Sequence, residues 1–98
     1  MKLNVSGKHL EMTDALYEHV SRRAEKFKRF WNRVTFVDVL MEKRGRHTYF
    51  FEYIVHADGH RPFVSHEKHE DLYAAIDLAA AKVERQLRSY HSRAVSHG

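Results

Sequence analysis

The chain has 98 residues, a formal net charge of +4 at pH 7 and no cysteine. This length predicts one domain over residues 1–90, followed by a short flexible tail over residues 91–98, where no apolar period is left. The lack of cysteine excludes disulfide frameworks and cysteine-ligated zinc. No apolar run approaches the ~20 residues that span a bilayer. Residues 1–6 are too short for a signal peptide, so we expect a cytoplasmic protein.

The first third of the chain predicts a strand and a long amphipathic helix. Residues 2–6 alternate polar and apolar side chains, which is typical of a short strand. Thr13 followed by Asp14 indicates a helix start, because threonine caps free N–H groups and an acid is favourable in the first turn. Apolar residues then recur at helical spacing, which predicts a helix over residues 14–31, stopped at Asn32.

The middle of the chain predicts three consecutive strands. Residues 34–42 are rich in β-branched and apolar side chains, and residues 48–57 are strongly aromatic. A polar turn with a glycine separates them, and an Asp-Gly pair at residues 58–59 predicts a second tight turn. Residues 61–67 form the fourth predicted strand. Pro62 predicts that this strand is short or at an edge, because proline cannot donate a ladder hydrogen bond.

The last predicted element is a helix whose first turn carries Glu70 and Asp71. Its apolar stripe comprises Leu72, Ile76, Ala79, Ala80, Val83, Leu87 and Tyr90. Leu78 lies outside the stripe. We expect it to pack against the first helix, and a contact with a partner is the alternative. Each helix must bury its stripe, so the order β-α-β-β-β-α predicts an α+β fold. In this fold two helices pack on one face of a four-stranded, mainly antiparallel sheet.

Positive charge gathers in three segments. Residues 22–33 carry six Lys or Arg against one Glu, residues 82–93 carry four against one, and residues 43–46 carry three. Segregated positive charge favours a polyanionic partner, because cations that neutralise phosphates release counterions. A solvated basic face without a partner would explain any single segment. Three such segments together favour RNA or DNA.

The basic side chains of the two helices lie away from the apolar stripes. On the first helix, one narrow strip comprises Arg22, Lys26, Arg29 and Arg33. Like charges at i,i+3 and i,i+4 destabilise an isolated helix, so this clustering favours a functional role. On the last helix, Lys82, Arg85 and Arg88 span a broader arc opposite the apolar stripe. We interpret both arcs as RNA-binding faces.

Several segments resemble the bacterial hibernation-promoting factor and ribosome-associated inhibitor family, which includes the sigma-54 modulation proteins. Residues 71–77 (DLYAAID) and 82–87 (KVERQL) resemble the family's second-helix signature. Residues 3–7 (LNVSG), 13–16 (TDAL) and 26–34 (KFKRFWNRV) resemble its opening and first helix. The segments follow one another in the family's order.

This resemblance implies a β-α-β-β-β-α fold akin to double-stranded-RNA-binding domains. It implies binding to the small ribosomal subunit and its rRNA, in the channel for messenger and transfer RNA, which blocks translation in stressed or stationary-phase cells. Some members also promote inactive ribosome dimers. Long members do so through a further C-terminal domain, which we do not expect here. By position, the family's basic residues match Arg23, Lys26, Arg33, Lys82 and Arg85, and Arg88 lies one place from another basic position.

The sequence predicts no enzyme, and we expect no cofactor, metal or small-molecule substrate. Residues 66–70 (HEKHE) lack the His-x-x-x-His spacing that places two zinc ligands on one helix face, which favours surface histidines near a turn. Glu70 and Asp71 could form a carboxylate pair, but acids in a first helical turn are more simply partners of the helix dipole. The glycines are isolated, so no phosphate-binding loop is indicated.

Two alternative functions use the predicted sheet. Residues 49–53 carry four aromatic side chains, which could stack single-stranded RNA bases on an open sheet face. Alternation predicts that Phe51 and Tyr53 fill the core, whereas Phe50 and Ile54 need cover or a partner. The element order also differs from that of RNA-recognition motifs. The same open face, or Leu78, could instead mediate self-association as a protein-interaction module.

Overall fold

The computed structural model describes residues 1–96 of the chain, with residues 91–96 described by their backbone alone. The elements follow in the order β1 (Lys2–Lys8), α1 (Asp14–Glu25), α2 (Phe27–Phe30), β2 (Val34–Lys43), β3 (Tyr49–Ala57), β4 (His60–His69) and α3 (Leu72–Ser96). The predicted tail over residues 91–98 lies outside the fully described residues. It therefore stays a prediction, as does the division of the chain at residue 90.

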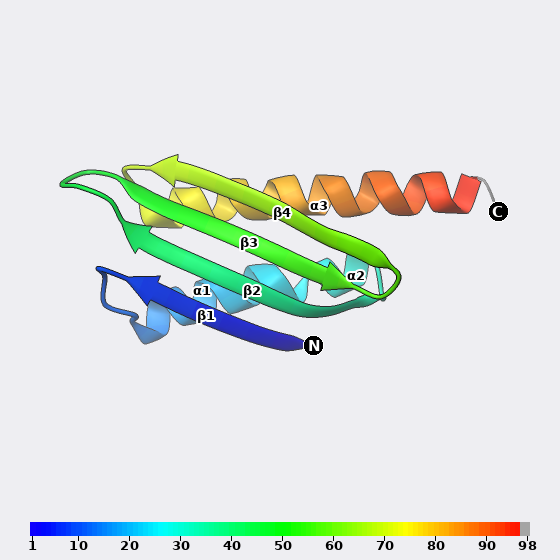
Figure 1. Cartoon of the computed structure of the whole chain (residues 1–98), viewed down its shortest axis with the longest axis horizontal. Coiled ribbons are helices and arrows are strands. Elements are labelled where there is room, and N and C mark those ends of the chain that lie inside the picture. The colour runs from blue at the N-terminus through cyan, green and yellow to red at the C-terminus, as the bar shows by residue number, and fades with distance from the viewer. Residues whose placement is uncertain (97–98) are drawn as a thin grey trace.

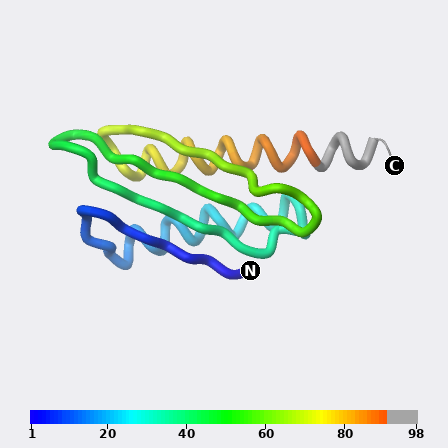
Figure 2. The backbone as a smooth tube through the Cα atoms, viewed as in Figure 1, coloured from blue at the N-terminus to red at the C-terminus, as the bar shows by residue number. Residues whose placement is uncertain are grey.

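The four strands form one sheet in the order β1-β2-β3-β4, with the helices on one side of it (Figure 1). β1 runs parallel to β2, whereas the β2–β3 and β3–β4 pairs are antiparallel. The turns that join β2 to β3 and β3 to β4 lie at opposite ends of the sheet (Figure 2). The α+β fold with a mainly antiparallel sheet and two long helices on one face is therefore confirmed.

The two faces of the sheet differ in burial. The face beneath the helices is buried and includes Val37, Val39, Met41, Phe51, Tyr53, Val55 and Phe63. On the opposite face, Phe36, Phe50 and Ile54 are half-buried, because no helix of the described chain covers them. The predicted core positions of Phe51 and Tyr53 are thus confirmed, and Phe50 and Ile54 lie on the open face.

Hydrogen bonds join the helices to the sheet at two buried points. The Tyr53 hydroxyl on β3 donates to the Val20 carbonyl on α1, at 3.0 Å. Burial raises the pKa of Tyr53 well above its ordinary value, so this hydroxyl keeps its proton as a donor. The Ser65 hydroxyl on β4 donates to the Ala79 carbonyl on α3, at 3.0 Å. These bonds fix the height of both helices above the sheet.

The predicted helix over residues 14–31 is divided at Lys26. The N–H of Arg29 donates to the Lys26 carbonyl at 3.0 Å, an i→i+3 bond that narrows the turn. Trp31 then has an extended backbone, with φ −156° and ψ 114°, and ends α2. Phe27 is fully buried and Trp31 is 8% exposed, so the division coincides with two aromatic side chains that both reach the core.

The prediction from Pro62 that the fourth strand is short or at an edge is confirmed by its edge position, although β4 has ten residues. An edge strand tolerates Pro62, because proline costs no ladder bond on the free side. The expected packing of Leu78 against the first helix is wrong, because Leu78 is 46% exposed. At this level the two helices meet through polar side chains instead, since His19 on α1 contacts Asp77 on α3.

The N-terminus of α1 is capped as the sequence predicts. The Thr13 side-chain oxygen accepts a hydrogen bond from the Leu16 N–H at 3.2 Å. Replacing Thr13 with alanine should lower the free energy of unfolding by about 1 kcal/mol, because a helix donor loses its partner. Thr13→Ser should retain most of this stability. Urea unfolding of both variants measures the effect, and an equal loss in both would argue against capping.

Candidate nucleic-acid interface

Most of the predicted cations are exposed, and they belong to the end of α1, to α2 and its flanks, and to the middle of α3. These three helices lie on one side of the sheet (Figure 1). The exposed predicted cations are Arg22, Lys26, Arg29, Arg33, Lys82, Arg85 and Arg88. We call these seven residues the basic face. Arg33 follows α2 rather than extending a continuous helix, because α2 ends at Phe30. The fold nevertheless brings the two basic segments of the sequence into one layer.

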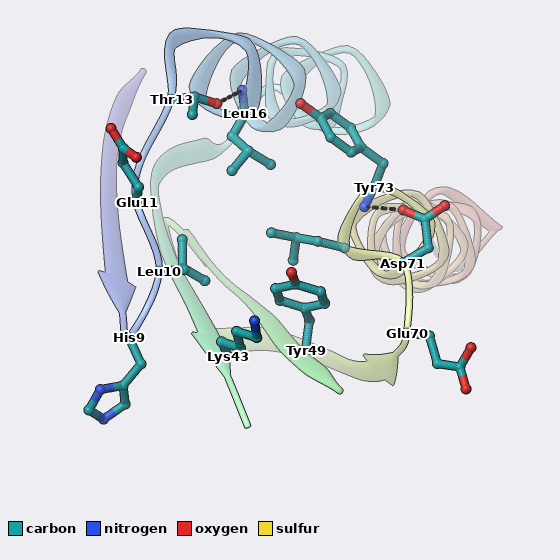
Figure 3. A pocket seen from close by; sticks show the side chains of 11 residues that line it. His9, Leu10, Glu11, Thr13, Leu16, Lys43, Tyr49, Glu70, Asp71 and Tyr73 are labelled. Atoms are coloured by element: carbon teal, nitrogen blue, oxygen red, sulfur yellow. Dashed lines mark hydrogen bonds between the residues drawn. The ribbon is translucent and has the colours of Figure 1, made fainter. Parts of the chain in front are cut away.

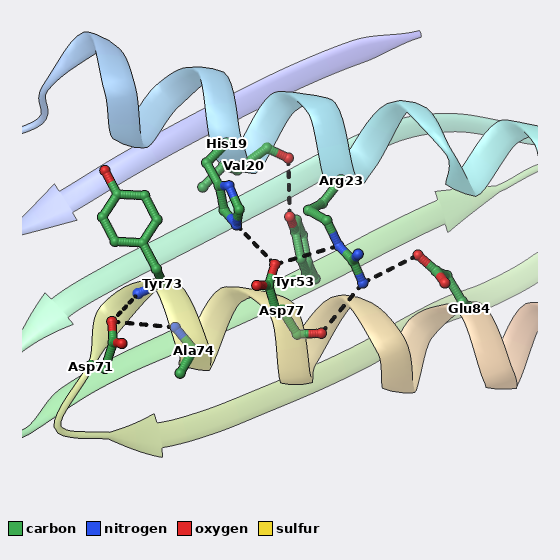
Figure 4. Close-up of polar contacts among 9 residues, drawn as sticks. All are labelled: His19, Val20, Arg23, Tyr53, Asp71, Tyr73, Ala74, Asp77 and Glu84. Carbon is green, nitrogen blue, oxygen red and sulfur yellow. Dashed lines mark hydrogen bonds and ion pairs between the residues drawn. The ribbon is translucent and has the colours of Figure 1, made fainter.

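Arg23 is the exception, because its guanidinium bridges α1 and α3 (Figure 4). It lies 3.7 Å from the Asp77 carboxylate and 3.5 Å from the Glu84 carboxylate, and its side chain is only 24% exposed. The same Asp77 carboxylate lies 2.8 Å from the His19 ring. Two carboxylates on α3 thus offset the charge of Arg23. These ion pairs hold the two helices together, and they leave Arg23 less available to a phosphate.

Two cations of the basic face have contacts of their own, and a third lines a cavity. The Lys82 ammonium forms an ion pair with Glu67 on β4. The Arg88 guanidinium lies 5.4 Å from the ring centre of Phe30, which joins α3 to α2. Arg85 lies beside a cavity next to β4. Exposed pairs are worth only about 0–1 kcal/mol, so a phosphate can compete for Lys82.

The third basic segment, residues 43–46, does not join the basic face. It lies at the end of β2 and in the β2–β3 turn, at the opposite end of the sheet from α2 (Figure 1). Arg44 contacts the Glu42 carboxylate there and lies 4.0 Å from the ring centre of Phe50. The hydrogen bond from Arg44 lowers the pKa of Glu42 below its ordinary value. In contrast, Lys28 on α2 is exposed and extends the basic segment, although the helical strip did not include it.

The open face of the sheet has a mixed character. The Phe36 and His56 rings stack there with their centres 4.9 Å apart. Carboxylates interrupt the apolar surface, since Asp38 pairs with Ile54 in the register and Glu52 pairs with Leu40. Negative side chains among the aromatic residues repel phosphates, so this face suits a nucleic acid less well than the basic face does.

The histidines make surface and packing contacts. The His69 ring accepts a hydrogen bond from the Asp71 N–H at 2.9 Å, and the His60 ring stacks on Phe63. Among the residues that the structure describes, no group of three or more His, Cys, Asp or Glu could hold a metal ion. Also within the described residues, no helix is both long and apolar enough to cross a bilayer.

Another cavity lies where α1 and α3 begin (Figure 3). It has a volume of about 710 Å³, and its lining includes the acids Glu11, Glu70 and Asp71. The Asp71 carboxylate accepts hydrogen bonds from the N–H groups of Tyr73 and Ala74, at 3.0 and 3.4 Å. Asp71 therefore caps α3, in keeping with the helix-terminus interpretation. Three acids make this cavity unsuitable for a phosphate.

The sequence matches a family model described as Sigma 54 modulation protein / S30EA ribosomal protein over residues 3–95. The chain belongs to this family. Relatives named ribosome hibernation promoting factor include one from Azotobacter vinelandii, 37% identical over 97% of this chain and 87% of that protein. Another, from Escherichia coli K12, is 32% identical over 99% of this chain and the whole of that protein. The family resemblance seen in the sequence is thus confirmed.

Two solved structures share the fold. A ribosomal subunit interface protein from Coxiella burnetii superposes with a TM-score of 0.84, over 94% of this chain and 99% of that chain, at 17% identity. The N-terminal domain of Thermus thermophilus Protein Y superposes with a TM-score of 0.79 at 29% identity, over 91% and 94% of the two chains. The arrangement of sheet and helices described above is therefore shared with these two proteins.

Proposed function

We propose that the chain is a ribosome hibernation factor that binds the small ribosomal subunit in the channel for messenger and transfer RNA. The single observation that carries this proposal is the basic face, whose cations extend from one layer of helices in a chain of this family. The partner is rRNA, and the place of action is the cytoplasm. Translation stops by steric competition, so the mechanism requires no bond chemistry.

The fold supports this proposal by holding the cations in place. The helices that carry them are fixed to the sheet by the buried bonds of Tyr53 and Ser65 and to one another by Arg23. Because the helices are already fixed, their backbone loses little conformational freedom when the cations meet phosphates, which favours affinity. Each phosphate that a cation neutralises releases counterions, so binding should weaken steeply with salt.

Single-stranded RNA binding on the open sheet face has less support. That face carries Asp38 and Glu52 among its aromatic residues, whereas the basic face has a large excess of cations. Self-association through the open face remains the alternative from a different class, and it predicts dimers of the free chain without any effect on ribosomes.

Co-sedimentation with purified small subunits across a salt series tests the proposal. We expect saturable, roughly stoichiometric binding that falls steeply with salt and is prevented by bound transfer or messenger RNA. Sedimentation profiles of whole ribosomes in the same experiment report whether the chain also promotes dimers. A failure to bind at low salt, or binding that transfer and messenger RNA leave unchanged, would contradict occupancy of the channel.

A further inference from the structure

A second cavity opens between the edge strand β4 and the second half of α3, where the basic face continues. Its volume is about 530 Å³, within the range of roughly 300–1,000 Å³ that is usual for small-ligand sites. The lining residues are His60, Phe63, Lys82, Arg85, Gln86, Ser89 and Tyr90. The family resemblance implies RNA contacts for Lys82 and Arg85, but it assigns no role to the aromatic residues of this lining.

Aromatic rings from three distant segments of the chain meet here, and those of β4 and α3 line the cavity. Tyr90 on α3 lies with its ring centre 4.3 Å from that of His60 and 4.8 Å from that of Trp31. His60 in turn stacks parallel to Phe63, at 4.3 Å. Trp31 and Phe63 are each 8% exposed, whereas His60 and Tyr90 are half-buried and line the cavity. Two rings are thus held against the core while two remain accessible.

The polar side chains of the lining suit an anion beside these rings. Lys82 and Arg85 supply positive charge, and the lining includes no carboxylate. The Gln86 amide N–H donates to the Val64 carbonyl at 3.2 Å, which fixes the carboxamide while its oxygen can still accept a bond. Aromatic faces beside cations match a base joined to a phosphate, because rings stack on bases and Arg or Lys binds phosphate.

We propose that this cavity binds one unpaired nucleotide of an RNA strand. The base stacks against Tyr90 and His60, and the adjoining phosphate contacts Arg85 and Lys82. The inference rests on the proposed function and deepens it. The basic face contacts phosphates, and this cavity adds a site that requires a base. It predicts that the chain prefers RNA with an unpaired nucleotide over a continuous duplex.

Trp31 supplies a probe for this test. It is the single tryptophan of the chain, and its ring lies next to that of Tyr90, so a base in the cavity should quench its fluorescence. The ligands are a short oligoadenylate, a ribose-phosphate oligomer of equal length without bases, and AMP. We expect saturable quenching by the oligoadenylate alone at low concentration. Tyr90→Ala should weaken that binding on the order of 10-fold, because a stacking surface is lost.

Two matched variants separate stacking from folding. Tyr90→Phe keeps the ring and should bind like the unmodified chain, and Tyr17→Ala removes an exposed tyrosine of α1 that lies outside the cavity. Equal binding of Tyr90→Ala and Tyr17→Ala, or of the two oligomers, would overturn the proposal. AMP binding as tight as oligoadenylate binding would also overturn it, by pointing to a free nucleotide. If Tyr90→Ala fails to fold, two measurements still test the proposal: oligoadenylate binding by Arg85→Gln, and binding of the oligomer without bases by the unmodified chain.

The proposal can fail independently of the proposed function. A chain that co-sediments with small subunits but binds both oligomers equally loses the nucleotide site and keeps the hibernation role. A chain that binds oligoadenylate through Tyr90 but does not bind small subunits keeps the site and loses that role.

Discussion

Replacing Arg22, Lys26 and Arg29 together with alanine should weaken binding to the small subunit on the order of 100-fold at low salt. Each of these side chains is exposed on α1, on α2 or at the junction between them, and none lines the cavity beside β4. A 100-fold loss corresponds to about 2.8 kcal/mol, or about 0.9 kcal/mol for each of three contacts, which lies within the range of about 0–1 kcal/mol for an exposed ion pair. The slope of log affinity against log salt should also fall, by about one unit per lost phosphate contact.

A second triple variant controls for net charge. Lys2, Arg46 and Lys68 are exposed cations on β1, in the β2–β3 turn and on β4, away from the helices. Their replacement with alanine removes the same charge but should change affinity only a few-fold, through long-range electrostatics alone. Co-sedimentation across the salt series measures both variants. Equal losses would show that overall charge, rather than the basic face, determines binding.

Local sequence signals predicted the fold well. Thr13 begins a helix because its side chain accepts a hydrogen bond from an N–H group only a few residues later, and the structure shows this bond from Leu16. Alternation along residues 48–57 placed Phe51 and Tyr53 correctly, because successive side chains of a strand point to opposite faces. Pro62 correctly indicated an edge, although proline restricts pairing on one side only and did not shorten β4.

Predictions that depend on a second helix were less successful. A helical wheel shows that Leu78 and Arg23 lie outside the central apolar stripe, but it cannot show which residues of the other helix face them. Asp77 and Glu84 attract Arg23 into the contact between α1 and α3, so this cation is half-buried and Leu78 stays in solvent. The helical wheel places Arg23 at the edge of the apolar stripe, and the structure shows its partners there, the carboxylates of Asp77 and Glu84.

The aromatic cavity was beyond sequence reasoning for the same reason. Trp31 follows α2, His60 begins β4 and Tyr90 lies late in α3, so their contact depends on the complete fold. In the sequence, Tyr90 is one apolar position of a stripe, and His60 is one of nine histidines. To place these rings together, one would need to know that residues 31, 60 and 90 lie close to one another in space.

The second large effect concerns the stability of the fold that holds the cations in place. Phe27 is fully buried at the start of α2, and its ring meets that of Tyr53 edge-on with centres 5.1 Å apart. Phe27→Ala should lower the free energy of unfolding by about 3–5 kcal/mol, because it removes buried apolar surface and leaves a cavity. Since domains of this size have only about 5–15 kcal/mol in total, the variant should be close to unfolding at 37 °C.

Two matched variants identify the cause of that loss. Phe27→Leu keeps most of the buried volume and should cost clearly less than alanine, whereas Tyr17→Ala removes an exposed ring of α1 and should change stability by at most about 0.5 kcal/mol. Urea unfolding with a constant m-value measures all three variants. Equal losses for alanine and leucine would indicate that the edge-on ring contact with Tyr53, rather than buried volume, makes position 27 important. In that case the contact between the two rings would stabilise the α1–α2 junction, and the basic face would depend on that contact.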